Sequence, residues 1–446
     1  MDSPICDFVS RYAVSDPLRL HMPGHKGSSF LGMEAIDITE IHGADSLYEA
    51  DGIIQQSEEN ASAIFGCPTY YSTEGSSLCI RAMLYLCMLH AKQKCKKPLI
   101  AAARNIHSTF IRAAAMLDFD IHWLYGDRKD GYLTCVIDPQ SLDHWLGSQQ
   151  AAPVAVYLTS PDYLGNVADI RVISKVCHKH GVLLIVDNAH GAYLKFLPHS
   201  QHPIDLGADM CCDSAHKTLP VLTGGAYLHI SDQAPKIFTR LAKQALAMFG
   251  STSPSYLILQ SLDAVNRYLV HTYPEQLRTF LPLCNQAKVE LAAHGYSFVG
   301  NEILKWTIDC KSYGYTGIQL AQQLKESNIH VEFSDPDYLV LMFTPEIGID
   351  GLKRLQTTLI GIPSRSPIVN SPPAPAIGVP ILTPRQAALS PSEIIPVKES
   401  FGRILSAPSV GCPPAVPIIV CGEQIDANTI ECFQYYGIEA CCVTIP

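Results

Sequence analysis

The chain has 446 residues, of which 47% are hydrophobic and 17% are charged. This length exceeds what one small core needs and predicts two or three domains. The 42 acidic residues outnumber the 32 lysines and arginines, and the resulting net charge of -10 argues against a nucleic-acid partner. No apolar stretch approaches the roughly 20 residues of a membrane span, and the short acidic start lacks the features of a signal peptide. We therefore expect a cytoplasmic protein.

The 16 cysteines are scattered along the chain and form no Cys-x-x-Cys pair. In a cytosolic protein such cysteines act as small buried apolar residues. The doublets Cys211-Cys212 and Cys441-Cys442 fit strands, where neighbouring side chains point to opposite faces. The sequence therefore predicts no metal site.

The first 60 residues are predicted to be irregular, with a glycine- and histidine-rich stretch at residues 21–27. From residue 57 to residue 230, short apolar runs alternate with helical periodicity, which is the rhythm of a βαβ sheet. The predicted strands are Leu99–Ala103, Ile121–Leu124, Val154–Leu158, Leu183–Val186 and Gly225–Ile230. The predicted helices between them are Ser77–Lys94 and Ile170–His180.

Three long helices are predicted next, at Gln233–Leu246, Ser255–Leu269 and Glu275–Ala293. A small α+β domain follows, with strands Trp306–Asp309, Val331–Phe333 and Leu339–Phe343 and helices Thr316–Ser327 and Asp350–Ile360. Seven prolines between residues 363 and 384 predict an extended connector, and the apolar run Val416–Cys421 belongs to a small terminal module. The predicted parts are an N-terminal segment (1–60), a large domain (61–295), the small domain (296–362), a linker (363–385) and the C-terminal module (386–446).

Polar residues follow three of the predicted strands directly. They occupy residues 105–108, 160–163 and 187–190. In open α/β sheets, ligands bind outside the carboxyl ends of the strands. We therefore expect these residues to converge on one site.

Lys217 and Asp187 have the chemistry that pyridoxal 5'-phosphate (PLP) requires. A lysine amine forms a Schiff base with the aldehyde of PLP, and a carboxylate pairs with the pyridine nitrogen. A solvated surface charge is the alternative for Lys217, but apolar residues flank it at 210–212 and 219–222. A helix cap or turn is the alternative for Asp187, but this residue ends the apolar run 181–186. We expect the functional role for both.

Candidate contacts to the rest of PLP surround these two residues. Gly75, Ser76 and Ser77 precede a helical run, where backbone N–H groups and the helix dipole bind phosphate, although a plain N-cap gives the same pattern. His107 could stack on the ring, although a histidine after a strand is more often a satisfied polar residue. The remaining candidates are close to the lysine or the aspartate in sequence: Ser214, His216 and His190.

Together these motifs resemble the Orn/Lys/Arg decarboxylase family, whose PLP enzymes have the aspartate-aminotransferase-like fold (fold type I). The similarity covers nearly the whole chain and is carried by residues 21–26, 73–77, 105–108, 160–165, 187–191, 214–218, 251–256, 402–404, 413–414 and 422–423. It implies an α/β large domain with a mostly parallel seven-stranded sheet, a small α+β domain and a C-terminal module. It also implies a homodimer or larger assembly with active sites at the dimer interface.

Carried over residue by residue, the resemblance gives each candidate a role. Lys217 would hold PLP, Asp187 would pair with the pyridine nitrogen, and His107 would stack on the ring. His190 would lie near the ring, and either His216 or Lys217 would protonate the α-carbon. The phosphate would lie at Gly75, Ser76 and Ser77, with Ser214 close by.

Three positions depart from the family pattern. Asn188 stands where glutamate is common, Asp162 where threonine is frequent, and Ala415 where glycine is usual. None of them is the lysine or the aspartate, so PLP binding is still expected and substrate choice is what the departures affect. The receiver-like N-terminal wing of the larger members is absent, and the decameric assembly of those members is therefore not assumed.

The implied reaction is decarboxylation of a basic amino acid to an amine of polyamine metabolism. Resemblance to the shorter members favours arginine, then lysine or ornithine. Glu332, Asp335 and Glu423 are candidates for the distal end of the substrate, although each has a surface charge as its alternative.

Two other readings compete with decarboxylation. Aminotransferases of this fold clamp the α-carboxylate with an arginine, and residues 301–350 contain none, although Arg354 or Arg385 could serve. An aminotransferase or a lyase therefore remains the alternative. A non-catalytic paralogue is the weaker one, because the lysine, aspartate, phosphate loop and histidine are all retained.

Overall fold

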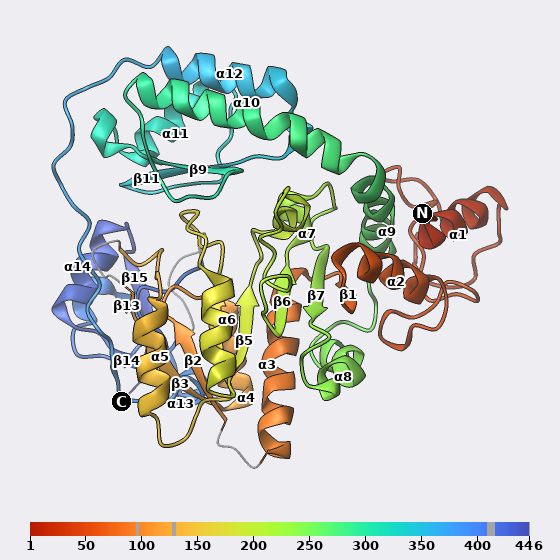
Figure 1. Ribbon diagram of the computed structural model, residues 1–446, viewed down its shortest axis with the longest axis horizontal. Coiled ribbons are helices and arrows are strands. Elements are labelled where there is room, and N and C mark those ends of the chain that lie inside the picture. The colour runs from red at the N-terminus through yellow and green to blue at the C-terminus, as the bar shows by residue number, and fades with distance from the viewer. Residues whose placement is uncertain (95–97, 127–130, 408–414, 446) are drawn as a thin grey trace. The chain divides into compact units, whose positions relative to one another are not determined.

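The computed structural model describes residues 1–94, 98–126, 131–407 and 415–445. The chain forms two compact units, each made of two separate segments (Figure 1). The first unit joins Met1–Lys96 to Leu183–Leu277, and the second joins Lys97–Val182 to Arg278–Pro446. The five-part division made from the sequence stays a prediction. Its motif at residues 413–414 lies outside the described residues.

The main sheet has seven strands in the order β1-β7-β6-β5-β4-β2-β3. Its strands are β1 (Thr69–Ser72), β2 (Leu99–Ala103), β3 (Asp120–Leu124), β4 (Ala155–Thr159), β5 (Leu183–Asp187), β6 (Met210–Asp213) and β7 (Ala226–Ile230). The pairs β2–β3, β2–β4 and β5–β6 are parallel, whereas β7 is antiparallel to both β6 and β1. The mixed α/β class with a mostly parallel seven-stranded sheet is therefore confirmed.

All five strands predicted for this sheet are present, and the sequence reading left out two more. These are β1, with the sequence TYYS, and β6, with the sequence MCCD. Each has only four residues, and β6 has no β-branched or aromatic residue, so the local pattern of β6 does not favour a strand. Its burial explains it, since all four of its residues are buried.

The first unit begins with helix, which corrects the prediction of an irregular N-terminal segment. Helix α1 (Pro4–Val14) starts with proline at its first position, where the missing N–H is no loss. Helix α2 (Ile53–Phe65) ends at Gly66, whose φ of 72° suits a glycine C-cap. The other long helices contributed to this unit are α3 (Gly75–Gln93), α8 (Lys236–Ala247) and α9 (Tyr256–His271).

The second unit contains helices that follow strands of the main sheet and a smaller sheet with helices of its own. Helices α4 (Ser108–Leu117), α5 (Pro139–Ser148) and α6 (Ile170–Lys179) follow β2, β3 and β4 along the chain. A four-stranded antiparallel sheet has the order β10-β11-β9-β8. Its elements are β8 (Ser297–Val299), β9 (Lys305–Asp309), α11 (Gly317–Glu326), β10 (Phe333–Ser334), β11 (Tyr338–Met342) and α12 (Gly348–Ile360), preceded by α10 (Tyr273–Ala293).

The C-terminal residues form a small body with its own apolar core. Residues 363–378 contain no helix or strand, as the proline-rich sequence predicts. Strand β13 (Ser392–Pro396) then pairs with β15 (Ala440–Thr444), and β12 (Val379–Pro380) pairs with β14 (Glu423–Gln424). Helices α13 (Pro384–Leu389) and α14 (Ala427–Tyr435) complete it. Its core consists of Val397, Leu405, Ile418, Ile419, Ile425, Cys432, Phe433, Cys441 and Val443.

Cysteine burial agrees with the sequence reading. Both doublets lie on strands, β6 and β15. Among the described cysteines, none is in a disulfide, and most are buried. None of the described helices combines the length and the apolar character that crossing a bilayer requires.

Candidate active site

Lys217 lies on a four-residue helix, α7 (Ala215–Thr218), directly after strand β6. Its Nζ lies 2.8 Å from Nε2 of His190, on the loop that follows the parallel neighbour β5. The side chain is half-buried and that of His190 is buried. Parallel strands thus bring together two predicted residues that are 27 positions apart in sequence.

Asp187 ends strand β5 and is buried, with only 2% of its surface exposed. Its Oδ1 accepts hydrogen bonds from the backbone N–H of Ala189 at 3.2 Å and from the thiol of Cys212 at 3.7 Å. Burial first, and then the charge of Asp187, raise the pKa of the Cys212 thiol well above its usual range. Cys212 therefore stays a neutral donor to this carboxylate.

The predicted phosphate loop stands at the start of the 19-residue helix α3. The hydroxyl of Ser214 donates to the hydroxyl of Ser76 at 2.8 Å, so two buried hydroxyls meet at this helix N-terminus. The N–H of Gly75 donates to the carbonyl of Gly224 at 2.7 Å. Gly224 has a φ of 100°, and a Cβ there would lie 2.8 Å from the carbonyl oxygen of Thr73, so this close approach requires glycine.

A contact of His216 with the backbone indicates which ring nitrogen carries a proton. Its Nδ1 lies 2.9 Å from the carbonyl oxygen of Gly225. A carbonyl only accepts, so Nδ1 carries the proton. Neutral His216 therefore has an unprotonated Nε2, and it can donate a proton from that nitrogen only after becoming cationic.

The residues of the first unit fit PLP by the chemistry of their donors. An amine on β6–α7, a buried carboxylate at the end of β5 and two hydroxyls at a helix N-terminus match the aldehyde, the pyridine nitrogen and the phosphate. Lys217, Asp187, Ser76 and Ser214 would hold the group. Ser77, His190 and His216 belong to the same unit.

His107 belongs to the second unit and has a clear local role. It is the N-cap of α4, and its Nδ1 accepts the backbone N–H of Thr109 at 3.2 Å. The alternative weighed for it, a satisfied polar residue after a strand, is therefore present. Stacking on the cofactor ring stays a prediction.

The three distal-substrate candidates differ in burial. Glu332 is exposed, as its surface alternative requires, whereas Asp335 and Glu423 are 6% and 2% exposed, so a surface charge is wrong for these two. Glu423 accepts hydrogen bonds from Arg104 at 3.0 Å and from the backbone N–H of Val420 at 2.8 Å. It is an internal counterion.

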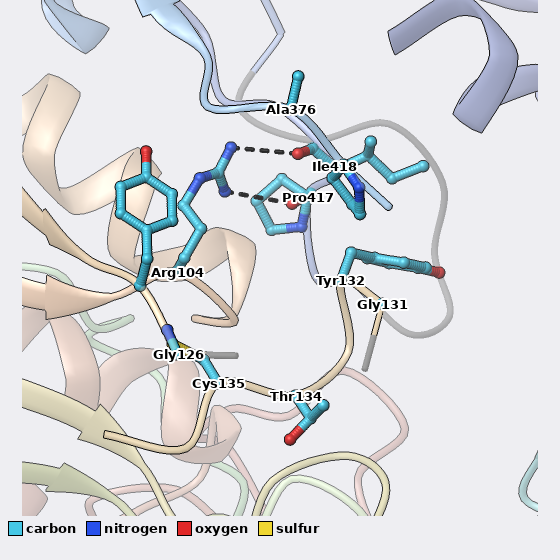
Figure 2. Close-up of a pocket in the computed structure, with 11 residues that line it drawn as sticks. Arg104, Gly126, Gly131, Tyr132, Thr134, Cys135, Ala376, Pro417 and Ile418 are labelled. Carbon is cyan, nitrogen blue, oxygen red and sulfur yellow. Dashed lines mark hydrogen bonds between the residues drawn. The ribbon is translucent and has the colours of Figure 1, made fainter. Parts of the chain in front are cut away.

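Arg104 lines a small pocket of the second unit, together with Tyr132, Thr134 and Cys135 (Figure 2). Figure 2 shows its guanidinium directed at two backbone carbonyls, those of Pro417 at 3.3 Å and Ile418 at 3.1 Å. With Glu423 as third acceptor, the cation is used within the protein. The pocket therefore does not present it to a ligand.

A buried network beside the site was missed by the sequence reading. Asp213, at the end of β6, accepts from Asn188, His202 and His229, and all four side chains are inaccessible to solvent. The signal was present, because Asp213 directly precedes the Ser214 motif at a strand end. The histidines could not be assigned, since each is distant from the motif in sequence.

Comparison with known proteins identifies the family. Residues 3–298 match the model of the major domain of Orn/Lys/Arg decarboxylases. The chain belongs to the Orn/Lys/Arg decarboxylase family. It is therefore a PLP-dependent decarboxylase, as predicted. The arginine decarboxylase of Bacillus subtilis is 28% identical over 96% of this chain and 92% of its own length. That of Halalkalibacterium halodurans is also 28% identical, over the same shares.

Solved structures show the same fold for this decarboxylase. The lysine decarboxylase of Francisella novicida superposes with a TM-score of 0.80 at 16% identity, covering 99% of this chain and 81% of its own. The constitutive lysine decarboxylase of E. coli gives a TM-score of 0.78 at 16% identity, covering 100% and 82%. At such identities the likeness concerns the fold alone.

Proposed function

We propose that this decarboxylase acts on arginine, with lysine and ornithine as the next candidates. The observation that carries the proposal is the similarity to arginine decarboxylases along 96% of the chain. The product would be the corresponding amine, a polyamine precursor. The paired Lys217 and His190, together with buried Asp187, support the chemistry.

PLP, when bound, supplies the electron sink that lets the bond between the α-carbon and the carboxylate break. Lys217 would supply the amine that holds the group. Asp187, which is buried and accepts a hydrogen bond from Cys212, would pair with the pyridine nitrogen. Ser76 and Ser214, at the start of α3, would bind and orient the phosphate end.

The proton for the α-carbon is better assigned to Lys217 than to His216. Nζ of Lys217 lies 2.8 Å from Nε2 of His190, so a hydrogen-bonded amine is already in place. His216 uses its Nδ1 proton on Gly225 and must first take up another proton. This assignment refines the prediction, which left both residues open.

The aminotransferase and lyase alternatives remain behind decarboxylation. The two arginines considered for an α-carboxylate clamp bind backbone carbonyls of the second unit. Arg354 donates to Ser327 at 2.5 Å, and Arg385 donates to Met116 at 3.0 Å. These contacts favour the assignment as a decarboxylase. A non-catalytic paralogue would have no reason to keep the buried Asp187 and the Lys217–His190 pair together.

The deciding experiment measures CO₂ and amine release from purified protein with added PLP, offered arginine, lysine and ornithine separately. We expect CO₂ and one matching amine, in largest amount with arginine. Preferential release from lysine or ornithine would correct the substrate. Keto acid formation without CO₂ would move the assignment to an aminotransferase.

We also propose that the protein is a homodimer. The N-terminal segment exposes large apolar side chains, among them Leu18 at 86%, Phe30 at 80% and Leu31 at 91%. Apolar groups gathered on one exposed segment mark interaction sites. A second copy of this chain is the partner that the family resemblance implies. A cytoplasmic location stays a prediction.

A further inference from the structure

Asp213 is a second buried carboxylate of the first unit, separate from Asp187. None of its surface is exposed. Its Oδ2 lies 3.1 Å from Nε2 of His202 and 3.2 Å from Nε2 of His229, and its Oδ1 accepts Nδ2 of Asn188 at 2.6 Å. Three donors from three different segments thus surround one carboxylate.

The charge of this cluster follows from its contacts. Burial alone would raise the pKa of Asp213, but the two histidines together hold that pKa well below its usual range. Burial lowers the pKa of His229, although the charge of Asp213 opposes this. Asp213 is therefore ionised, and the neutral form of His229 is favoured. A buried charge of this kind is stable only with its full set of donors.

The network connects the two strand ends that carry the proposed catalytic groups. Asn188 follows Asp187 directly, and its backbone N–H donates to the carbonyl of Cys212 at 3.0 Å. Its side chain then reaches Asp213, four residues before Lys217. The relative position of Asp187 and Lys217 is thus fixed by side-chain as well as backbone contacts.

We propose that Asp213 is a positioning residue of this decarboxylase, acting through Asn188 to hold Asp187 and Lys217 in register. The inference rests on the proposed roles of Asp187 and Lys217. It also explains a departure from the family pattern, because a glutamate at position 188 would place a second carboxylate beside Asp213. Two buried like charges in contact repel each other strongly. An amide at position 188 and a carboxylate at position 213 therefore belong together.

The geometry offers an isosteric exchange as the test. In Asp213→Asn, two amides face each other; in Asn188→Asp, two carboxylates do. In the double variant, the amide at position 213 donates to the carboxylate at position 188, while its oxygen still accepts from both histidines. The double variant therefore restores the donor-acceptor pattern, and the negative charge lies at position 188 instead of position 213.

The measurements are PLP affinity and the visible absorbance spectrum on reloading of the apoprotein, together with kcat/KM. We expect Asn188→Asp to weaken PLP binding and kcat/KM by at least about tenfold, roughly 1.4 kcal/mol. Asn188→Asp and Asp213→Asn should both shift the visible absorbance spectrum, and in the same direction. The double variant should recover to within about threefold of the unmodified protein.

Asp209→Asn is the matched control. Asp209 is also buried, but it precedes β6 and its Oδ2 accepts the N–H of Leu184 at the far end of β5. We expect this variant to lower the unfolding midpoint without changing the spectrum or the PLP affinity. A merely structural role for Asp213 would give the same result there.

Three results would overturn the inference. The first is a double variant whose PLP affinity and kcat/KM are as low as those of the worse single variant. The second is an absorbance spectrum that is unchanged in both single variants and in the double variant. The third is a stoichiometric metal ion in the purified protein, because a cation beside His202, Cys211 and Asp213 would replace the hydrogen bonds. If arginine, lysine and ornithine all fail as substrates, the spectra and PLP affinities still decide the inference separately from the proposed function.

Discussion

In this decarboxylase, the role proposed for a side chain depends on its hydrogen-bond partners more than on its residue type. Asp187 and Asp213 both end parallel strands and are both buried, yet one receives a thiol and a backbone N–H, and the other receives two imidazoles and an amide. Asp187 is the carboxylate proposed for the cofactor nitrogen, and Asp213 is the proposed positioning residue.

Replacement of Lys217 by alanine should abolish both PLP retention and turnover. The amine that holds the cofactor and contacts His190 would be gone. The checks are the visible absorbance of the protein after dialysis against PLP-free buffer and CO₂ release. Lys195→Ala is the control, since Lys195 is half-buried like Lys217 and pairs with Asp205 in the same unit. A retained cofactor spectrum in Lys217→Ala would remove the basis of the site.

Ala415 shows why its position usually carries glycine. Its φ is 59°, in the left-handed region, where a Cβ costs roughly 1–2 kcal/mol. Ala415→Gly should therefore raise the free energy of unfolding by about 0.5–1 kcal/mol, after the entropy that glycine adds to the unfolded chain. Urea unfolding measures this. Ala387→Gly, within helix α13, should lower it by about 1 kcal/mol. A loss of stability in Ala415→Gly would contradict the strain.

Asp335 predicts a pH dependence of stability. Burial, and then the charge of Asp337, raise its pKa from 3.8 to about 6, against two backbone hydrogen bonds that lower it. A raised pKa in the folded state favours the protonated form, so this contribution is full below pH 3.8 and is lost as the pH rises through 6. The shift corresponds to up to about 3 kcal/mol at neutral pH.

Asp335→Asn should therefore be more stable than the unmodified protein at pH 8, with a smaller difference at pH 5. The amide keeps the oxygen that accepts the N–H groups of Asp337 and Tyr338. Urea unfolding at both pH values gives the comparison. Asp350→Asn, at an exposed position in the first turn of α12, should lower stability slightly and by the same amount at both pH values. Equal stability differences at both pH values would refute the assignment.

At the scale of elements, loops of the second unit are held by the C-terminal body. The loop from Arg104 to Ser108, which carries His107, is bound at both ends. Arg104 contacts Pro417, Ile418 and Glu423, and the N–H of Ser108 donates to the carbonyl of Ala415 at 2.8 Å. The segment 415–423 therefore holds both ends of that loop in place through hydrogen bonds.

Glu423→Gln should weaken the attachment of the 104–108 loop to segment 415–423. The Arg104–Glu423 side chains are 14% and 2% exposed, so removing the charge leaves a largely buried cation without its counterion. We expect a loss of about 1–3 kcal/mol and faster amide hydrogen exchange at residues 104–108 and 415–423. Glu393→Gln breaks the more exposed pair with Arg403 and should cost under about 1 kcal/mol. Unchanged exchange in Glu423→Gln would show that the backbone contacts suffice.

At the scale of the whole molecule, periodicity and apolar runs located the five longer strands of the main sheet and the helices α3, α6, α8, α9, α10, α11 and α12, because burial of a repeating pattern is a local signal. They did not locate α1, α2, α4 or α5. Strand β6 and its Asp213 network were not predictable that way. The partners of Asp213 come from residues 188, 202 and 229, and only the fold brings them together. Lys217 and Asp187 could be proposed from the sequence because their chemistry is specific, whereas the burial of Asp335 and Glu423 depends on contacts that no local pattern reveals.

The assembly is the last property that the chain itself predicts. Exposed Phe30 and Leu31 would be covered in a homodimer, and the free energy for covering them is about 25 cal/mol per Å² of apolar surface. The double variant Phe30→Ser/Leu31→Ser should therefore shift the protein from twice the mass of one chain towards a single chain, as measured by light scattering after size exclusion. Leu389→Ser, which replaces a side chain 72% exposed on the C-terminal body, is the control and should leave the mass unchanged. Because the family resemblance places active sites at the dimer interface, the first variant should also lose activity on dilution. A single-chain mass for the unmodified protein would contradict the dimer, and full activity at that mass would show that one chain completes its own site.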